Sequence, residues 1–185
     1  MNNTYFITGI GTGIGKTIIS SILTEKLKAD YWKPIQSGDL EISDSLFVKH
    51  LVSPNTTILP ESYRLSEPLS PHLSARLDGI EISLASIKKP ETDNNLIIEG
   101  AGGLMVPLND KELILDLIKS LGAKVIIVSQ NYLGSINHTL LTIEMLKIHQ
   151  IEIAGLIFNG VKNEESEQYI ENYSNVKVLG RIPKM

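Results

Sequence analysis

The residues with the clearest chemical character lie near the amino terminus, in the stretch GIGTGIGKT at positions 9–17. Four glycines within seven residues allow the backbone to turn tightly and to bring successive N–H groups towards a bound anion. Lys16 can reach the terminal phosphates of a nucleotide, and the Thr17 hydroxyl can join the coordination shell of Mg²⁺. An apolar run precedes the stretch and a helical pattern follows it, so we predict a phosphate-binding loop between a strand and a helix.

The same glycines fit two other interpretations. The pattern TGxxxGIG of short-chain dehydrogenases matches residues 8–15 and predicts a nicotinamide cofactor. Such an enzyme also needs a tyrosine followed four residues later by a lysine, and only Tyr173 and Lys177 have this spacing, in a polar stretch near the chain end. The dinucleotide pattern GxGxxG fails in both frames. A plain glycine-rich connection is the remaining alternative, and we favour the phosphate loop.

Two further charged residues stand where open α/β sheets bind ligands. Lys33 ends a short run, residues 31–33, that reads as a strand, and Pro34 stops that strand because it lacks a backbone donor. Such sheets hold ligands at the carboxyl ends of their strands. Asp44 lies in the first turn of a helix predicted at residues 43–52. Taken alone, Lys33 also fits a solvated loop lysine, and Asp44 also fits a carboxylate that stabilises a helix amino terminus.

A second predicted strand that is followed by glycines lies in the middle of the chain. The apolar residues 96–98 lead to Glu99, and GAGG at positions 100–103 follows. P-loop enzymes place a Mg²⁺-directed acid at the tip of a strand beside the phosphate loop. Glu99 is therefore a candidate metal ligand, and the glycines allow the backbone to approach the phosphates. The alternative is that Glu99 pairs with a nearby lysine and that the glycines only turn the chain.

Strands alternate with helices along the chain, which requires crossover connections and predicts an α/β fold with a mainly parallel, doubly wound sheet and helices on both faces. We expect strands at 5–8, 31–33, 95–99, 124–129, 153–159 and 176–179, and helices at 15–28, 43–52, 113–121, 136–150 and 164–173. Residues 36–38 are expected to turn the chain. The proline-rich stretch 53–79 is expected to leave the main sheet as an excursion with the character of a lid.

Length and composition narrow the class of protein. With 185 residues, 42% of them hydrophobic, we expect one domain over residues 1–185. A net charge of −4 without a basic block argues against a nucleic-acid partner, and the lack of cysteine excludes disulfides and thiolate catalysis. No apolar run approaches the roughly 18 residues of a membrane span. The first predicted strand also starts too early for a signal peptide, so we expect a cytoplasmic protein with no membrane partner.

Further motifs occur in the order found in the dethiobiotin synthetase family, the ATP-dependent enzymes that close the ureido ring in biotin synthesis. The chain resembles this family in the loop ending GIGKT, then in KPIQSG (33–38), SDS (43–45), EPLSPH (67–72), IEGAGGLMVPL (98–108), LGSINH (133–138), FNGV (158–161) and GRIP (180–183). Each motif alone is unspecific, but together they span nearly the whole chain. The resemblance implies a P-loop ligase that uses ATP as co-substrate and Mg²⁺ as cofactor.

The resemblance also implies the reaction and its partners. One amine of 7,8-diaminopelargonate takes up CO₂ to form a carbamate, which attacks the γ-phosphate of ATP. The second amine then closes the ring on the resulting mixed anhydride and releases phosphate. The family pattern implies a homodimer in which residues 133–137 of the neighbouring subunit hold the far carboxylate of the substrate.

Site residues follow from the resemblance position by position. The implied catalytic residues are Lys33 and Lys16, and the implied metal ligands are Thr17, Asp44 and Glu99. ATP would be bound by Gly13, Ile14, Gly15, Lys16, Thr17, Ile18, Asp44, Glu99, Gly100, Ala101, Gly102, Asn159, Gly160, Pro183, Lys184 and Met185. The substrate would be bound by Thr12, Ser37, Pro71, Leu133, Gly134, Ser135, Ile136 and Asn137.

The chain departs from the family at three loop positions. Most relatives carry Thr-Asp where this chain has Ile10 and Gly11, and many carry an acid in place of Gly13. We expect backbone contacts to the phosphates to persist without those side chains. Partition-type P-loop ATPases, which act as nucleotide switches, carry an additional lysine where this chain has Gly11. This absence argues against that alternative.

Overall fold

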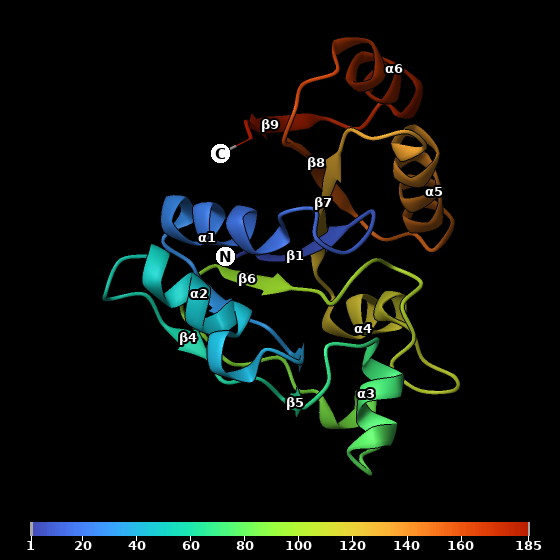
Figure 1. The fold of residues 1–185 in the computed structure, drawn as a ribbon. Helices are drawn as coiled ribbons and strands as arrows, with labels where there is room; N and C mark the ends of the chain where they lie inside the picture. The colour runs from blue at the N-terminus through green and yellow to red at the C-terminus, as the bar shows by residue number, and fades with distance from the viewer. Residues whose placement is uncertain (1, 185) are drawn as a thin grey trace.

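The computed structural model describes residues 2–184, and its centre is a seven-stranded sheet (Figure 1). Neighbouring strands are parallel at every pairing in this sheet, which confirms the predicted doubly wound α/β fold. The strands, in their order across the sheet, are β4 (Ile58–Leu59), β2 (Asp30–Trp32), β6 (Leu96–Glu99), β1 (Thr4–Gly9), β7 (Lys124–Gln130), β8 (Ile153–Asn159) and β9 (Val178–Ile182).

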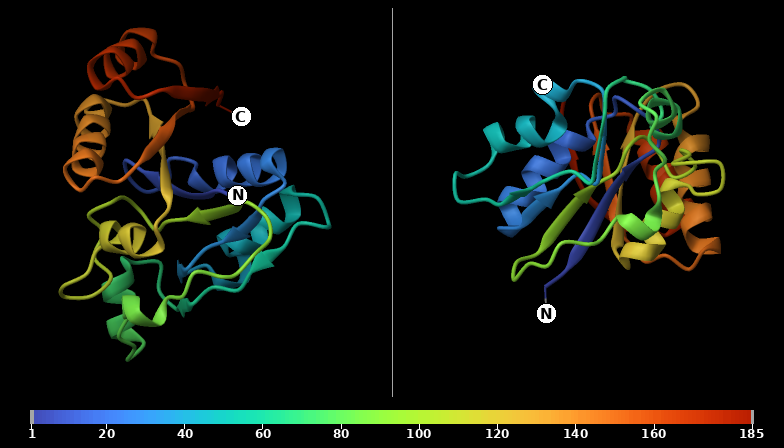
Figure 2. Two further views of the ribbon diagram at one scale, coloured as in Figure 1. Left: turned by 180° about the vertical axis from the view of Figure 1, so that it is seen from behind. Right: turned by 90° about the horizontal axis from the view of Figure 1, so that it is seen from below.

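Helices cover both faces of the sheet, as Figure 2 shows when the molecule is seen from below. They are α1 (Lys16–Leu27), α2 (Asp44–Leu51), α3 (Pro71–Leu77), α4 (Ile114–Leu121), α5 (Ser135–Ile148) and α6 (Glu164–Ser174). The predicted helices are all present, with ends shifted by at most a few residues. Within residues 2–184, no helix is long and apolar enough to cross a membrane.

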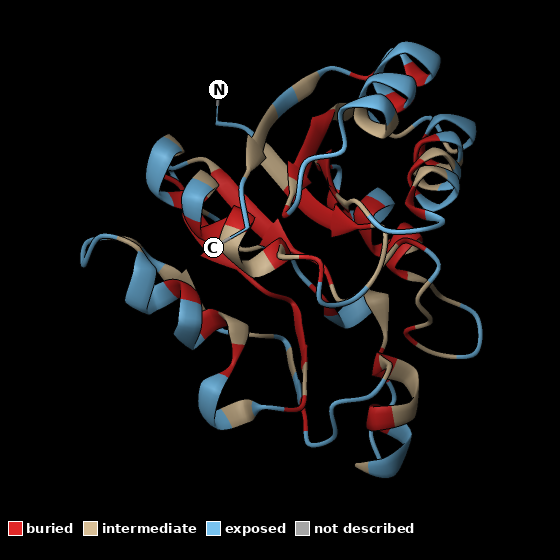
Figure 3. Cartoon of the chain, turned by 45° about the horizontal axis from the view of Figure 1, so that its top comes forward, coloured by how far each residue is buried: buried red, intermediate tan, exposed pale blue. Residues whose placement is uncertain are grey.

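Alternation along the buried strands divides the core into two layers. Phe6 packs on the side of α4, α5 and α6, whereas the next residue, Ile7, packs on the side of α1 and α2. Side chains of a strand alternate between the two faces of a sheet, so the runs that are apolar throughout fill both layers. Figure 3 shows the result, with buried strands inside and the outward faces of the helices exposed.

The segment after β2 differs from the prediction. Residues 36–38 were expected to turn, but Ile35–Ser37 forms the short strand β3, which pairs in parallel with β5 (Tyr63–Leu65) in a separate two-stranded sheet. Gly38, with φ of +70°, makes the turn itself, and its N–H donates to Leu65 O. The 3₁₀ helix η1 (Leu40–Ile42) then leads towards α2.

The proline-rich excursion is only partly detached from the main sheet. Its first strand, β4, pairs with β2 at the edge of the seven-stranded sheet, which corrects the expectation that the whole stretch leaves that sheet. The rest supplies β5 and α3, and Pro71 stands at the first position of α3, where its missing N–H costs nothing. A second 3₁₀ helix, η2 (Leu84–Ser86), precedes β6.

The strand order sets where a ligand can bind. After β6 the chain crosses β1 and continues with α4 and β7, so β1 lies between the two halves of the sheet. Open α/β sheets bind ligands at the carboxyl ends of the strands beside such a switch point. The carboxyl ends of β1, β6 and β2 carry the predicted loop, Glu99 and Lys33.

Candidate active site

The predicted phosphate loop connects β1 to α1 (Figure 1). Gly15 precedes α1 with φ of +91°, and a Cβ there would lie 2.1 Å from Asn159 Nδ2, so only glycine fits. The Asn159 side chain donates to Ile14 O at 2.8 Å and thereby ties the loop to the end of β8. The loop is thus held in a turned conformation that leads into the amino terminus of α1.

Strand register places Lys33 beside Glu99. Tyr31 on β2 is the partner of Ile97 on β6, and both side chains pack in the core layer of α1 and α2. Because side chains alternate along a strand, Glu99 faces the same layer as Ile97. Lys33 follows the end of β2 two residues after Tyr31, and its ammonium lies 3.3 Å from Glu99 Oε1. Both residues are buried although charged.

Helix α2 contributes the second carboxylate. Ser43 caps α2 by accepting from Leu46 N, and Asp44 N–H donates to the Gln36 side chain at 3.3 Å. These contacts fix Asp44 at the start of the helix, where Asp44 Oδ2 lies 2.6 Å from Lys33 Nζ. The helix-dipole alternative for Asp44 is therefore incomplete, because the carboxylate also pairs with a buried lysine.

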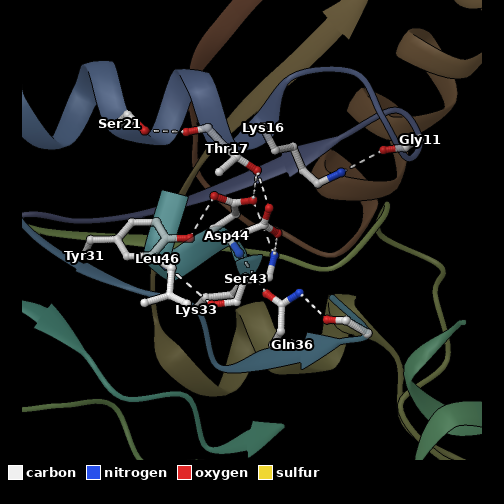
Figure 4. A network of polar contacts seen from close by, with 12 residues as sticks. Gly11, Lys16, Thr17, Ser21, Tyr31, Lys33, Gln36, Ser43, Asp44 and Leu46 are labelled. Carbon is white, nitrogen blue, oxygen red and sulfur yellow. Dashed lines mark hydrogen bonds and ion pairs between the residues drawn. The ribbon is translucent and has the colours of Figure 1, made fainter. Parts of the chain in front are cut away.

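Thr17 joins the carboxylates of Asp44 and Glu99, and Figure 4 shows the Thr17 side chain beside Asp44. Its hydroxyl oxygen lies 2.9 Å from Asp44 Oδ1 and 2.8 Å from Glu99 Oε1. One hydroxyl proton can serve only one of these acceptors at a time, so oxygen acceptors exceed donors at this point. Two carboxylates and a hydroxyl are the hard oxygen ligands that Mg²⁺ takes, with water and phosphate oxygens completing its shell. Within residues 2–184 no larger group of acidic or histidine side chains forms a metal site.

Burial and pairing move the pKa values of the charged residues in different directions. Burial lowers the pKa of Lys16 to about 8, against the opposing pull of Glu99, and its ammonium donates to Gly11 O at 2.9 Å. Burial also disfavours the charged form of Lys33, but the carboxylates of Glu99 and Asp44 outweigh it and raise its pKa. Asp44 has a lowered pKa because Lys33 more than offsets its burial. The Lys33–Asp44 pair is therefore held charged.

One cavity of about 830 Å³ collects most of the predicted site residues. The cavity lies at the carboxyl edge of the sheet, beside the phosphate loop. The predicted residues that line it are Thr12, Gly13, Gly15, Lys16, Thr17, Ile18, Lys33, Ser37, Asp44, Pro71, Glu99, Gly100, Ala101 and Gly102. Ile14 instead turns inward and is buried in the core.

The other predicted residues lie outside this cavity wall. Asn159 contacts the back of the loop, and Gly160 N–H donates to Ile182 O at 2.8 Å, next to the exposed Pro183 and Lys184. Residues 133–137 run from the loop after β7 into the first turn of α5, and Leu133 in that loop is fully exposed. Met185 lies outside the described residues. In a single copy of the chain, residues 133–137 therefore do not meet the cavity.

Sequence reasoning missed two features of the site. The Tyr31 hydroxyl donates to Glu99 Oε2 at 2.9 Å, although an aromatic residue in a strand is ordinarily read as core. Its position two residues before Lys33 was a usable signal, because the two then face the same side. The apolar part of the cavity wall, which includes Ile42, Phe47 and Leu69, also gave no periodic signal in the sequence.

Solved structures with a similar fold are P-loop ATPases. A putative plasmid partition protein from Borrelia burgdorferi bound to AMPPNP has a TM-score of 0.63 at 13% identity, covering 100% of this chain and 87% of that one. A ParA family ATPase from Chlorobium tepidum has a TM-score of 0.56 at 15% identity, with coverage of 100% and 86%. At such low identity the likeness shows the fold alone, that of a P-loop NTPase.

Sequence relatives are much more similar. A protein-family model described as AAA domain matches residues 3–185. The ATP-dependent dethiobiotin synthetase BioD of Christiangramia forsetii is 56% identical over 98% of this chain and 88% of its own length. The protein of the same name from Cytophaga hutchinsonii is 54% identical over 95% and 85%, and that from Brucella ovis is 48% identical over 99% and 87%. The chain therefore belongs to the family of ATP-dependent dethiobiotin synthetases, which are ligases that form carbon–nitrogen bonds.

Proposed function

We propose that this protein catalyses the ATP- and Mg²⁺-dependent carboxylation and ring closure of 7,8-diaminopelargonate, which yields dethiobiotin, ADP and phosphate. The observation that supports this proposal most strongly is that Lys16 and Lys33 line one cavity together with Thr17, Asp44 and Glu99. Its volume of about 830 Å³ lies within the range of small-molecule sites. Because the reaction consumes ATP, we place it in the cytoplasm.

The nucleotide phosphates would lie against the backbone of residues 13–18 and against the turn at residues 100–102. The amino terminus of α1 and its preceding glycines favour an anion at this position. Thr17, Asp44 and Glu99 would hold Mg²⁺, since the Thr17 hydroxyl lies within hydrogen-bonding distance of both carboxylates. When bound there, Mg²⁺ offsets the negative charge that develops on the phosphoryl oxygens.

The base of the nucleotide would lie near the end of β8. Asn159 and Gly160 follow this strand, and the pairing of Asn159 with Ile182 brings the chain after β9 alongside them. Pro183 and Lys184 would complete this wall. Arg181 reinforces it by donating to Gly160 O at 2.9 Å and by pairing with Glu167.

The carbamate would lie between the two lysines. Ser37 Oγ is buried in the cavity wall and has no hydrogen-bond partner within the described residues, so it is available to a polar substrate group. Thr12, in the phosphate loop, lines the same cavity. We assign both hydroxyls to the carbamate, with Lys16 and Lys33 stabilising the negative charge that develops there.

The proposed chemistry proceeds through three bond-forming steps. A neutral amine of the substrate attacks CO₂ and loses a proton, which gives the carbamate. A carbamate oxygen then attacks the γ-phosphorus and displaces ADP, which gives a carbamic-phosphoric mixed anhydride. The second amine attacks the carbonyl carbon, loses a proton and expels phosphate, closing the ring without a protein nucleophile.

The charges of the site residues affect the first step, the attack of the amine on CO₂. The ammonium groups of Lys16 and Lys33 are matched by the carboxylates of Asp44 and Glu99, so these four side chains sum to zero. A nearby cation lowers the pKa of an alkylammonium group and favours the neutral amine that attacks CO₂. In our proposal Lys33 exerts this effect on the substrate when Asp44 and Glu99 are engaged by other partners.

A homodimer would complete the substrate site. Residues 133–137 precede and begin α5, and the exposed Leu133 lies at their tip. We propose that this segment of one copy reaches the cavity of the other and holds the far carboxylate of the substrate. The backbone N–H groups at the start of a helix suit such an anion.

The proposal is tested by incubating the protein with ATP, Mg²⁺, bicarbonate and 7,8-diaminopelargonate. We expect mass spectrometry to detect the cyclic urea, with one ADP and one phosphate released for each ring closed. ADP release that does not depend on the diamine would instead indicate a simple ATPase. A parallel titration with nicotinamide nucleotides, followed by fluorescence, checks the dehydrogenase alternative.

A further inference from the structure

Tyr31 contacts the proposed metal site from its buried side, away from the cavity. Its hydroxyl donates to Glu99 Oε2 at 2.9 Å, and Tyr31 is completely buried. The residue does not line the cavity, so it cannot touch a ligand there directly. Its strand β2 neighbours β6, which carries Glu99, and the backbone pairing of the two strands fixes the distance between them.

The two carboxylate oxygens of Glu99 have different partners. Oε1 lies 2.8 Å from the Thr17 hydroxyl and 3.3 Å from the Lys33 ammonium, both of which line the cavity. Oε2 accepts from Tyr31, on the buried side. The terminal torsion of a glutamate side chain is broad and weakly restrained by itself. A hydrogen bond from a rigid, buried ring therefore selects the orientation that turns Oε1 towards the cavity.

The Tyr31 hydroxyl is suited to remain a donor. An ionised carboxylate oxygen can only accept, so the proton of this hydrogen bond belongs to the Tyr31 hydroxyl. A buried carboxylate oxygen without this donor would lose a hydrogen bond that water cannot replace.

We propose that Tyr31 is a positioning residue of the metal site: by holding Glu99 Oε2, it presents Glu99 Oε1 to Mg²⁺ beside Thr17 and Asp44. This inference rests on the proposed function, in which Glu99 is a metal ligand. Hydrogen bonds to the far side of a metal ligand commonly change metal affinity by about 10- to 100-fold.

The direct test is Tyr31→Phe, which removes the hydroxyl and keeps the ring. Mn²⁺ binding is measured by electron paramagnetic resonance at saturating AMPPNP, and dethiobiotin formation is measured against Mg²⁺ concentration. We expect the Mn²⁺ dissociation constant and the half-saturating Mg²⁺ concentration to rise by about tenfold or more. KM for diaminopelargonate should change by less than about twofold. An unaltered Mn²⁺ affinity would overturn the inference.

Two controls separate positioning from general damage. Tyr5→Phe removes a phenol that packs against the same core layer from β1, and it should leave Mn²⁺ affinity unchanged. In a Glu99→Gln background, Tyr31→Phe should weaken Mn²⁺ binding by less than about twofold, because the carboxylate it positions is gone. If the two substitutions act additively, Tyr31 does not act through Glu99 and the inference is wrong.

The wild-type protein provides a test that does not depend on the folding of a variant. The buried phenolic proton of Tyr31 is observed by NMR and assigned through its contacts within the core. Addition of Mg²⁺ and AMPPNP should shift this signal, because a metal-bound carboxylate is a weaker acceptor; an unmoved signal contradicts the inference. A wild-type protein that makes no dethiobiotin contradicts the proposed function instead, so the two failures are distinguishable.

Discussion

Lys33 Nζ lies 2.6 Å from Asp44 Oδ2, so the proposed catalytic lysine is paired with a proposed metal ligand. The same ammonium lies 3.3 Å from Glu99 Oε1. Lys33 therefore offsets part of the negative charge of the two carboxylates that would bind Mg²⁺. A divalent cation would compete with the lysine for the same oxygens, and metal binding would release Lys33 towards the substrate.

This pairing predicts an unusual property of Lys33→Met. Dethiobiotin formation should fall by about 100-fold or more, because a preorganised charge at the reacting oxygens is lost. Mn²⁺ affinity of the nucleotide-free protein should rise, since the buried Glu99 and the half-buried Asp44 no longer have a lysine between them. Electron paramagnetic resonance measures that affinity. Lys16→Met is the matched control, because Lys16 bonds Gly11 O rather than a carboxylate. Equal Mn²⁺ binding by wild type and Lys33→Met would rule out the competition.

Ser37 predicts a separation of substrate binding from nucleotide binding. Ser37→Ala should raise KM for diaminopelargonate by about tenfold, as expected for the loss of one hydrogen bond to a charged group. The dissociation constant for ATP should stay within about twofold. Ser45→Ala is a matched control, because Ser45 Oγ is also buried without a partner within the described residues but lies outside the cavity wall. Steady-state kinetics of both variants test this prediction. If Ser37→Ala and Ser45→Ala have the same KM for diaminopelargonate, Ser37 does not bind the substrate.

The exposed Leu133 predicts the consequence of separating two copies of the chain. Leu133→Glu should shift the protein from dimer to monomer in analytical ultracentrifugation and should raise KM for diaminopelargonate, because a buried charge at an interface is unfavourable. ATP binding to the isolated copy should persist. Ile148→Glu serves as control, since Ile148 is exposed at the opposite end of α5. A Leu133→Glu dimer with unaltered kinetics would argue against a shared site.

Glu167 predicts a pH dependence of stability. Burial opposes the charged form, but its bonds to Arg181 outweigh this and hold the pKa of the carboxyl below its ordinary 4.5. Stability from such a group is complete above the ordinary pKa and is lost as the pH falls through the lower folded value. Glu167→Gln should therefore be less stable than wild type by about 1.5 kcal/mol near neutral pH.

Denaturant titrations across the acid range check this expectation. The difference between wild type and Glu167→Gln should shrink as the pH is lowered from about 7 to about 3. Glu164 at the start of α6 forms an exposed ion pair with Lys162. Glu164→Gln is therefore a control that should change the stability little at any pH. A stability difference that stays constant with pH would show that the charge of Glu167 is not its source.

The sequence was sufficient for the parts of the site that follow strand-end rules. The glycine-rich loop, Lys33 after β2 and Glu99 at the end of β6 were predicted because each combines an apolar run with a breaking residue and a charge. Parallel strands then bring their carboxyl ends to one edge, so these residues had to meet. The doubly wound fold followed from the same alternation of strands and helices.

Other parts depend on tertiary contacts that local patterns do not report. β4 spans only Ile58–Leu59 and β3 only Ile35–Ser37, too short for any periodicity, and both exist because a neighbouring strand is present. The hydrogen bond of Tyr31 to Glu99 joins residues 68 positions apart and depends on strand order. The proposed contribution of residues 133–137 would depend on a second copy of the chain.

The central claim is that this cavity closes a cyclic urea through a carbamic-phosphoric anhydride, and oxygen transfer tests it most directly. The protein is mixed with ATP, Mg²⁺, 7,8-diaminopelargonate and freshly dissolved ¹⁸O-labelled bicarbonate in unlabelled water, and the products are sampled before the label exchanges. Mass spectrometry of the phosphate should show one ¹⁸O transferred for each dethiobiotin formed, because a carbamate oxygen leaves with the phosphate. Dethiobiotin accompanied by unlabelled phosphate, or phosphate released without dethiobiotin, would contradict the account.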